Sequence, residues 1–594
     1  MKFFKYVFAS ALGTMLAGIV LLVILIGLII GSISAALDDV SSERSSTISK
    51  NSVLMIRLED EITERSKKDD FEIPGFSKKQ IGLNEILKNI EKAKEDDKIV
   101  GIYLNVSDIG AGIASVEAIR NALVDFKKSG KWIVAYSELY TQSAYYLSSC
   151  ADEVYLNPEG MIFFQGISAK PMFMKEMFDK LGFEMQVIRG KDNKFKSAVE
   201  PFMYNEMSDE NKAQTSKLIF SIWDHIVNEI AASRGITIDN VNKIADELTG
   251  LFPDSALNSG FIDGLKYHDE IESILAEKLS EDLLDEGQLV ELKKYTQTKL
   301  KKTKSSDFRK KKVAVIYAVG DMMGGEGDDE TIGSDRISKA IREARLDTTV
   351  KAIVLRVNSP GGSALAADVI WREATLIENE KPFIVSMGDY AASGGYYISA
   401  PADRIFAEVN TITGSIGVFG LMPNAQGLLN DKLGIYFDGV KTNQHSDWMD
   451  ISKPLSASEF EVRQRGVDKA YDSFTSKVAE GRNIRQSYVD SIGQGRVWTG
   501  IDAIDIGLVD EIGGLEDAIV YAAELAGIDD YRIQELPLQK SPFEELFSDL
   551  GMGASQKAME NALVNYQLLQ QFKYIQSILK MEGIQVVLPI RISL

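Results

Sequence analysis

The sequence predicts an α/β protein made of two tandem copies of one domain, preceded by an N-terminal transmembrane helix. Three observations lead to this prediction: strands alternate with helices, the two halves repeat, and the chain begins with a long apolar run. Apolar segments at Ile99–Leu104 and Val350–Leu355 have the length of buried strands, and each precedes a glycine-containing loop and a helical stretch. Alternation of this kind is typical of a parallel sheet.

The two halves correspond at a nearly constant offset. Asp96 and Asp347 lie 251 positions apart, and Lys180-Leu-Gly182 resembles Lys432-Leu-Gly434 at an offset of 252. Such an offset over this length indicates a duplicated domain; the alternative is chance similarity of two unrelated α/β domains. We therefore expect an anchor at 1–40, a first repeat at 48–290, a linker at 291–312, a second repeat at 313–535 and a tail at 536–594.

The N-terminal segment has no charged residue from Tyr6 to Leu37. A helix needs about 20 apolar residues to cross a bilayer, and this run exceeds that length. Lysines precede the run and acidic residues follow it, so the N-terminus is expected to be cytoplasmic and the remaining chain to lie outside the inner membrane. The alternative is a signal peptide that is cleaved after the small residues Ser34–Ala36.

Composition excludes several classes of function. The 594 residues carry a formal net charge of −21, which argues against a nucleic-acid partner because phosphate binding needs a basic face. With one cysteine, Cys150, and three histidines, a zinc cluster of Cys and His ligands is not expected. We predict neither a metal nor a cofactor.

Two glycine-rich segments of the second repeat have the composition of a catalytic site. In Asn358-Ser-Pro-Gly-Gly-Ser363, the paired glycines allow backbone N–H groups to approach a ligand, although a plain turn has the same composition. In Gly388–Tyr397, Ser393 stands just before a helical stretch, where free N–H groups could stabilise an oxyanion. An N-cap serine is the alternative.

A nucleophilic serine needs a base, which is usually histidine. Of the three histidines, His445 lies in a polar loop and is the rival candidate. Lysine is the other possibility, because burial lowers its pKa and leaves a neutral amine. Lys191, Lys194 and Lys196 are all candidates, and physical reasoning from the sequence does not choose among them.

Three motifs together resemble a known family. Asn358–Ser363, Tyr390-Ala-Ala-Ser-Gly-Gly-Tyr396 and Thr413-Gly-Ser-Ile-Gly417 are similar to those of bacterial protease IV, or signal peptide peptidase A, in its long duplicated form. The phrase Lys196-Ser-Ala-Val-Glu-Pro-Phe202 is the most specific match. The resemblance covers nearly all of the chain to about residue 535.

The resemblance implies a membrane-anchored serine endopeptidase. It makes Ser393 the nucleophile and Lys196 the general base, with Ser415 orienting the lysine and the N–H groups of Gly362 and Gly394 forming the oxyanion hole. It further implies two crotonase/Clp-like α/β spiral domains, a homotetramer, and signal-peptide remnants as substrates. A crotonase-type acyl-CoA enzyme and a catalytically inert membrane scaffold are the rival interpretations.

Overall fold

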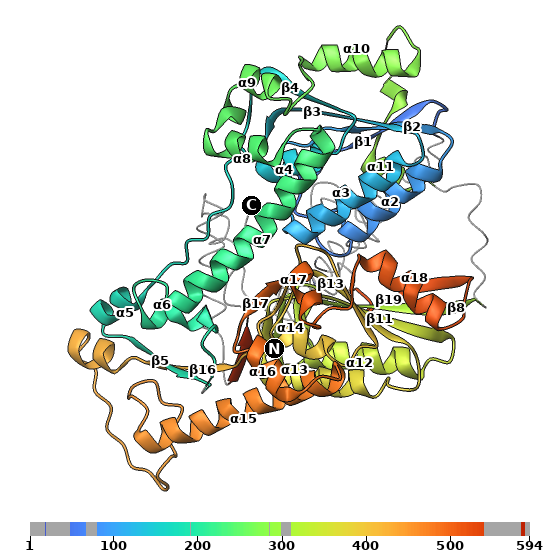
Figure 1. Ribbon diagram of the computed structural model, residues 1–594. Helices are drawn as coiled ribbons and strands as arrows, with labels where there is room; N and C mark the ends of the chain where they lie inside the picture. The colour runs from blue at the N-terminus through green and yellow to red at the C-terminus, as the bar shows by residue number, and fades with distance from the viewer. Residues whose placement is uncertain are drawn as a thin grey trace.

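The computed structural model (Figure 1) shows two α/β halves with an arm to one side of them. It describes Gly13, Gly18 and residues 48–66, 80–190, 192–283, 286–298, 310–539 and 584–587. The predicted anchor at 1–40, apart from those two glycines, lies outside the described residues. So do residues 562–569, whose apolar spacing in the sequence is that of a helix. Within the described ranges, no helix has both the length and the apolar character needed to cross a bilayer.

The first half is built on a six-stranded sheet in the order β6-β4-β3-β2-β1-β7, and its neighbouring strands run parallel. The predicted strand at Ile99–Leu104 is confirmed as β2, whose residues are all buried except Val100, which is half-buried. Its strands are β1 (Ser52–Ile56), β2 (Ile99–Leu104), β3 (Trp132–Tyr140), β4 (Glu153–Ile162), β6 (Gly264–Leu265) and β7 (Leu289–Glu291). Its helices are α2 (Leu83–Glu95), α3 (Ile113–Lys127), α4 (Gln142–Ser148), α8 (Ile238–Asp246), α9 (Pro253–Asn258), α10 (His268–Leu279) and α11 (Leu292–Tyr295).

The second half repeats this plan around a sheet with the path β17-β15-β13-β11-β8-β19. The predicted strand at Val350–Leu355 is confirmed within β11, which is parallel to both of its neighbours. The strands are β8 (Lys311–Val319), β11 (Val350–Ser359), β13 (Phe383–Ala392), β14 (Arg404–Ala407), β15 (Ile412–Gly414), β17 (Val497–Thr499), β18 (Glu511–Ile512) and β19 (Tyr531–Leu536). The helices are α12 (Ser334–Leu346), α13 (Ala364–Thr375), α14 (Gly394–Ser399), α16 (Gln486–Ile492), α17 (Gly500–Asp505) and α18 (Leu515–Leu525).

Corresponding residues of the two halves have the same structural roles. Asp96 and Asp347 both follow the last residue of a helix, and each side chain accepts a hydrogen bond from the backbone N–H two positions later. Gly182 and Gly434 both have left-handed backbones, with φ of 70° and 67°. These shared details confirm that the two halves are copies of one domain.

A third sheet joins the halves, with strands in the order β10-β9-β12-β20-β16-β5. Within it, β5 of the first half pairs antiparallel with β16 of the second over six residue pairs. In Figure 1, β5 and β16 lie in the arm with α5, α6 and α15, and the long helix α7 runs from the arm to the first half. Its strands are β5 (Glu184–Arg189), β9 (Asp321–Met323), β10 (Thr331–Gly333), β12 (Gly361–Ser363), β16 (Phe419–Asn424) and β20 (Ile584–Val587); the helices around it are α5 (Lys175–Leu181), α6 (Glu200–Met203), α7 (Asp209–Arg234) and α15 (Ala457–Gly481).

A buried carboxylate connects the two halves near the end of β13. Asp389 reaches the first turn of α3, where it accepts hydrogen bonds from the backbone N–H of Ser115 at 2.9 Å and from its hydroxyl at 2.7 Å. Free N–H groups at a helix N-terminus are well suited to bind an anion. A Cβ on Gly112 would lie 2.2 Å from Asp389 Cγ, so only glycine permits this approach.

A second connection lies beside the first. Arg356 donates two hydrogen bonds to Glu64, and both side chains are buried. Asn358 also donates to Glu64, at 2.8 Å, and accepts a hydrogen bond from the N–H of Tyr390. The strand that leads to Ser393 is thus held against the first half by hydrogen bonds at several positions.

Gly112→Ala tests this connection. The added methyl group would displace Asp389 from α3, so the free energy of unfolding should fall by about 1–3 kcal/mol. Chemical denaturation of the purified protein measures the change. Gly439→Ala is the matched control, because no atom lies within 4 Å of the Cβ it would add. Equal stability of the two variants would show that Gly112 does not make room for a necessary contact.

Candidate active site

Lys196 lies in the segment that follows β5 and precedes the short turn Ser197–Val199. Its side chain is fully buried. Its Nζ atom is 2.8 Å from Ser393 Oγ, 2.9 Å from Ser415 Oγ and 3.0 Å from the carbonyl oxygen of Ser415. The first half therefore supplies an amine, and the second half supplies the three oxygen atoms around it.

Burial lowers the pKa of Lys196 well below its ordinary value, because removal from water penalises the ammonium form. A neutral amine has two N–H donors and one lone pair. It can donate to the hydroxyl and the carbonyl of Ser415 while its lone pair accepts the hydroxyl proton of Ser393. The three neighbours thus match the hydrogen-bonding capacity of an uncharged lysine.

Segments of both halves enclose Lys196. The N–H of Phe195 donates to the carbonyl of Gln494 at 3.0 Å. A Cβ on Gly495 would lie 2.6 Å from the Cβ of Lys196, so this glycine lets the loop pass directly over the lysine. Gln214 of α7 donates to the carbonyl of Phe195 at 2.9 Å. These contacts hold the lysine backbone and exclude water from its side chain.

Ser393 stands at the carboxyl end of β13, immediately before α14. Its backbone has a φ of 55°, which is uncommon for a residue other than glycine and is a form of strain seen at functional sites. Its N–H donates to the carbonyl of Gly414 at 2.8 Å. Ser393 does occupy the N-cap position of α14, but its side chain makes no capping hydrogen bond with the helix.

Ser415 lies beside Ser393 because of the sheet. β13 and β15 are parallel neighbours that pair Ala392 with Gly414, and each serine directly follows its strand. The carboxyl ends of parallel strands meet at one edge of a sheet, so the two side chains converge there. Ser415 also has a positive φ, of 52°, and its N–H donates to the carbonyl of Arg496.

The two glycines expected to form an oxyanion hole lie on different elements. Gly394 is the first residue of α14, where backbone N–H groups have no acceptor within the helix. Gly362 is the middle residue of β12, and a Cβ at this position would lie 2.1 Å from the carbonyl oxygen of Met322. The expectation of a loop at Asn358–Ser363 is wrong in part, because these residues form the end of β11 and the short strand β12.

The equivalent region of the first half has a different geometry. Ser143, the counterpart of Ser393, lies inside α4, and Thr141 caps that helix. Its backbone is not among those with a positive φ. Gly112 is the counterpart of Ser363. The carboxylate of Asp389 lies in the space that a side chain at Gly112 would fill. The first half has therefore replaced the glycine-rich site by a contact between the repeats.

The other candidate bases lie elsewhere. His445 is exposed, and its Nδ1 atom is 3.8 Å from Glu459. His225 lies 3.0 Å from Glu117, to which it is hydrogen-bonded. Lys194 is exposed, although only two positions separate it from Lys196. Lys191 lies outside the described residues.

Comparisons with known proteins agree with this geometry. The model of peptidase family S49 matches residues 125–281 and 375–529. The chain is also 35% identical to Protease 4 of Haemophilus influenzae over 498 residues, which cover 81% of this chain and 80% of that protein. The chain belongs to peptidase family S49. It is a serine peptidase, and Lys196, Ser393 and Ser415 all fall within the two matched regions.

Two further S49 relatives match most of the chain. Protease 4 of Salmonella typhi is 36% identical, and the alignment covers 76% of this chain and 73% of that protein. The chloroplastic serine protease SPPA of Arabidopsis thaliana is 32% identical, with 81% and 70% covered. The similarity therefore extends over both S49 repeats.

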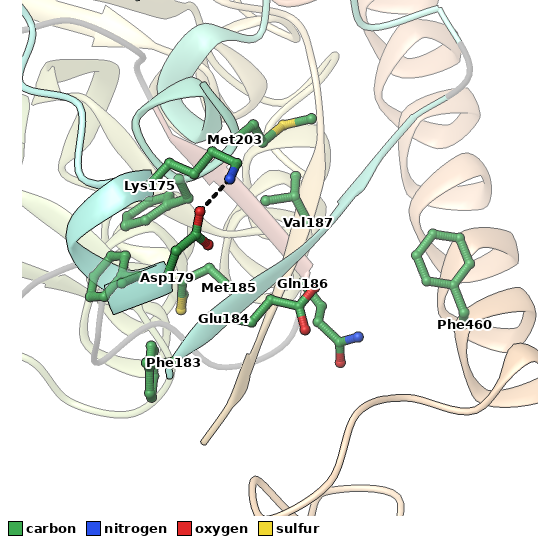
Figure 2. Close-up of a pocket in the computed structure, with 11 residues that line it drawn as sticks. Lys175, Asp179, Phe183, Glu184, Met185, Gln186, Val187, Met203 and Phe460 are labelled. Atoms are coloured by element: carbon green, nitrogen blue, oxygen red, sulfur yellow. Dashed lines mark hydrogen bonds and ion pairs between the residues drawn. The ribbon is translucent and has the colours of Figure 1, made fainter. Parts of the chain in front are cut away.

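A separate cavity of about 380 Å³ lies in the arm, between α5, β5, α6 and α15. Its walls combine apolar side chains with the polar residues Lys175, Asp179, Glu184 and Gln186. Figure 2 shows Phe460 projecting from α15 toward β5, and Lys175 paired with Asp179 on α5. None of Lys196, Ser393 and Ser415 lines this cavity.

Lys196→Met tests whether the amine is held neutral. An unfolded lysine titrates near pH 10.4, so between the lowered pKa and about pH 10 the folded protein binds fewer protons than the unfolded chain. The stability of the wild type should therefore rise with pH through that window. At neutral pH the variant should be more stable, by about 1.4 kcal/mol for each pH unit between the unfolded value near 10.4 and pH 7, or the lowered pKa where that is higher.

Denaturation curves from pH 6 to 10.5 measure this difference. The advantage of Lys196→Met should shrink as the pH approaches 10. Lys194→Met is the matched control, because its side chain is exposed, and it should show no such trend. A Lys196→Met advantage that does not vary with pH would contradict the burial of a neutral amine.

Proposed function

We propose that the chain is a Ser/Lys-dyad endopeptidase that hydrolyses peptides through an acyl-enzyme. The observation that carries this proposal is the 2.8 Å separation of Lys196 Nζ and Ser393 Oγ in a fully buried setting. A general base must lie within hydrogen-bond distance of the proton it abstracts, and its pKa must be low enough to leave it unprotonated. Lys196 meets both conditions.

In the first step, the neutral amine of Lys196 removes the hydroxyl proton of Ser393 as Oγ attacks the peptide carbonyl. The carbonyl oxygen becomes an oxyanion, which the N–H groups of Gly362 and Gly394 stabilise. The resulting ammonium donates hydrogen bonds to the hydroxyl and the carbonyl oxygen of Ser415. Lys196 then donates its proton to the leaving nitrogen, the C–N bond breaks, and an ester on Ser393 remains.

In the second step, Lys196 accepts a proton from a water molecule that attacks the ester. The tetrahedral intermediate uses the same N–H groups, and its collapse returns the proton from Lys196 to Ser393 Oγ as the acid product leaves. Ser415 orients the lysine throughout. The crotonase-type alternative lacks support, because the relatives that match most of the chain are proteases.

We also propose that the enzyme is anchored in the bacterial inner membrane by residues 1–40, with its N-terminus cytoplasmic and both repeats outside the cytoplasm. The uncharged stretch from Tyr6 to Leu37 and the lysines before it support this orientation. Cleaved signal peptides and other membrane-proximal peptides are the proposed substrates, since such peptides are released at this membrane and are apolar.

We further propose that each repeat has the crotonase/Clp-like spiral fold and that the chain assembles as a homotetramer. The arm exposes apolar side chains along the connection between β16 and α15, which an isolated chain would leave in water. The exposed residues are Leu433, Ile435, Tyr436, Phe437, Val440, Trp448, Met449 and Ile451. Contact with a second copy would bury them.

Substitution of the dyad tests the proposed chemistry. Hydrolysis of a peptide ester should fall by about 10²–10⁴-fold in Lys196→Ala, because general-base catalysis is lost. It should fall at least as far in Ser393→Ala, and a fluorophosphonate probe should no longer label that variant. Lys194→Ala is the matched control and should retain full activity. Substantial hydrolysis by either dyad variant would refute the assignment.

Extraction and light scattering test the anchor and the assembly. The full chain should stay in the membrane pellet after carbonate treatment and should need detergent for release. In detergent, the wild type should have the protein mass of four chains, whereas the double variant Tyr436→Asp, Phe437→Asp should have a smaller mass. Leu283→Asp, at an exposed position of the first half, should leave the mass unchanged. A monomeric wild type would exclude the tetramer.

A further inference from the structure

Gln214, in the second turn of α7, holds the chain on both sides of Lys196. Its side chain is buried. The amide nitrogen, Nε2, donates one hydrogen bond to the carbonyl oxygen of Phe195 at 2.9 Å and another to the hydroxyl of Ser197 at 2.6 Å. An amide nitrogen has two N–H groups, so both are used. Phe195 and Ser197 are the immediate neighbours of the proposed base, and a single side chain therefore fixes both.

The orientation of this amide follows from its partners. The carbonyl oxygen of Phe195 can only accept a hydrogen bond, so the nitrogen of Gln214, and not its oxygen, must face the segment. The oxygen, Oε1, is buried and has no hydrogen-bond partner among the described residues. A buried polar atom without a partner costs stability. The two contacts to the lysine segment are made despite that cost, which an apolar side chain of the same length would not incur.

A buried carboxylate joins the same segment to the start of α7. Glu200, four residues after Lys196, is fully buried. It accepts hydrogen bonds from the hydroxyl of Ser208 at 2.6 Å and from the side-chain amide of Asn211 at 2.8 Å. It also accepts one from the backbone N–H of Ser208, the N-cap residue of α7. A carboxylate is favoured at a helix N-terminus, so Glu200 and Gln214 attach the lysine segment to α7 at two places.

The same face of α7 reaches the strand beside Ser415. Gln214 and Ser221 are seven positions apart, which is two turns of helix, so they lie on one face. The hydroxyl of Ser221 is 3.0 Å from that of Thr499, a residue of β17. β17 pairs antiparallel with β15, the strand that ends just before Ser415. One helix thus contacts both the segment of the base and the strand that supports its orienting serine.

We propose that Gln214 is a positioning residue, which keeps Nζ of Lys196 at hydrogen-bond distance from Ser393 Oγ. It does so by fixing Phe195 and Ser197 against α7. This inference rests on the proposed function, because it concerns the geometry of the same dyad. Without the two contacts the lysine backbone can move, the contact with Ser393 lengthens and water reaches the amine. A displacement of about 1 Å is enough to slow a reaction about 100-fold.

Gln214→Met in the full-length protein tests this role. Methionine keeps the length of the side chain and removes both N–H donors, but it also removes the unpartnered oxygen, so the denaturation midpoint should stay close to that of the wild type. The kcat for a peptide ester should fall at least about tenfold with KM unchanged, because acylation and deacylation both use the lysine. Ser216→Met is the matched control on the same helix; its side chain is exposed, and the variant should have wild-type kinetics.

The pH dependence of Ser393 labelling by a small fluorophosphonate separates positioning from a general loss of structure. Water that reaches the amine raises its pKa toward the value of a solvated lysine, so the labelling midpoint in Gln214→Met should move up by about one pH unit or more. The substitution alters no charge. The charged side chains that contact the lysine segment or belong to it also stay in place: Arg189, Lys194, Glu200 and Arg496.

Two further measurements address the contact itself. Ser197→Ala removes one of the two acceptors and should lower kcat by less than Gln214→Met does. In the Gln214→Met background it should lower kcat no further, because both residues act through one contact. Hydrogen exchange of the backbone amides of residues 195–199, measured by mass spectrometry on the Ser393→Ala protein, requires no catalysis. It should become faster when Gln214→Met is added.

Three results would overturn the inference. An unchanged kcat and unchanged exchange in Gln214→Met would mean that the amide does not hold the segment. A lower kcat with a lower denaturation midpoint, and with no shift of the labelling midpoint, would mean that its role is structural only. Additive effects of Gln214→Met and Ser197→Ala would mean that the two residues act separately. Failure of the dyad itself would appear as a wild type that the probe does not label, and the exchange measurement would still test Gln214.

Discussion

The burial of one amine is the constraint on which the site depends. Lys196 is fully buried beside Ser393 and Ser415, and burial lowers its pKa. The amine belongs to one repeat and the two serines belong to the other, so their separation is a distance between domains. Any change in the relative position of the repeats would admit water, raise the pKa of the amine and lengthen the contact with Ser393.

The contacts between the repeats hold Lys196 of the first repeat at hydrogen-bond distance from Ser393 of the second. Asp389 lies four residues before Ser393 and binds the first turn of α3. The pairing of β5 with β16 fixes the strand that precedes Lys196. The first repeat lacks the backbone geometry of Ser393 at Ser143 and makes these contacts instead, while the second repeat has the glycine-rich strand. The two copies have diverged into a part that holds the base and a part that holds the nucleophile.

Much of the fold could be predicted from the sequence, because strand–helix alternation and the repeat offset are local or periodic signals. The same signals could not separate Lys194 from Lys196, since burial is a tertiary property and the two residues differ in it completely. Resemblance to a family singled out Lys196, and the structure places it beside Ser393. The role of Gly495 was missed, because it depends on a segment distant in sequence; only the glycines around Gln494 hinted at a close approach.

The protonation state of Lys196 is the central claim, and the pH dependence of Ser393 acylation tests it most directly. The rate of labelling by a small fluorophosphonate should rise with pH and reach half of its maximum well below pH 10, because the amine becomes a base at its lowered pKa. The same experiment on Lys196→Ala should show slow labelling without that midpoint. A midpoint near pH 10.4, the value of a solvated lysine, would contradict the account.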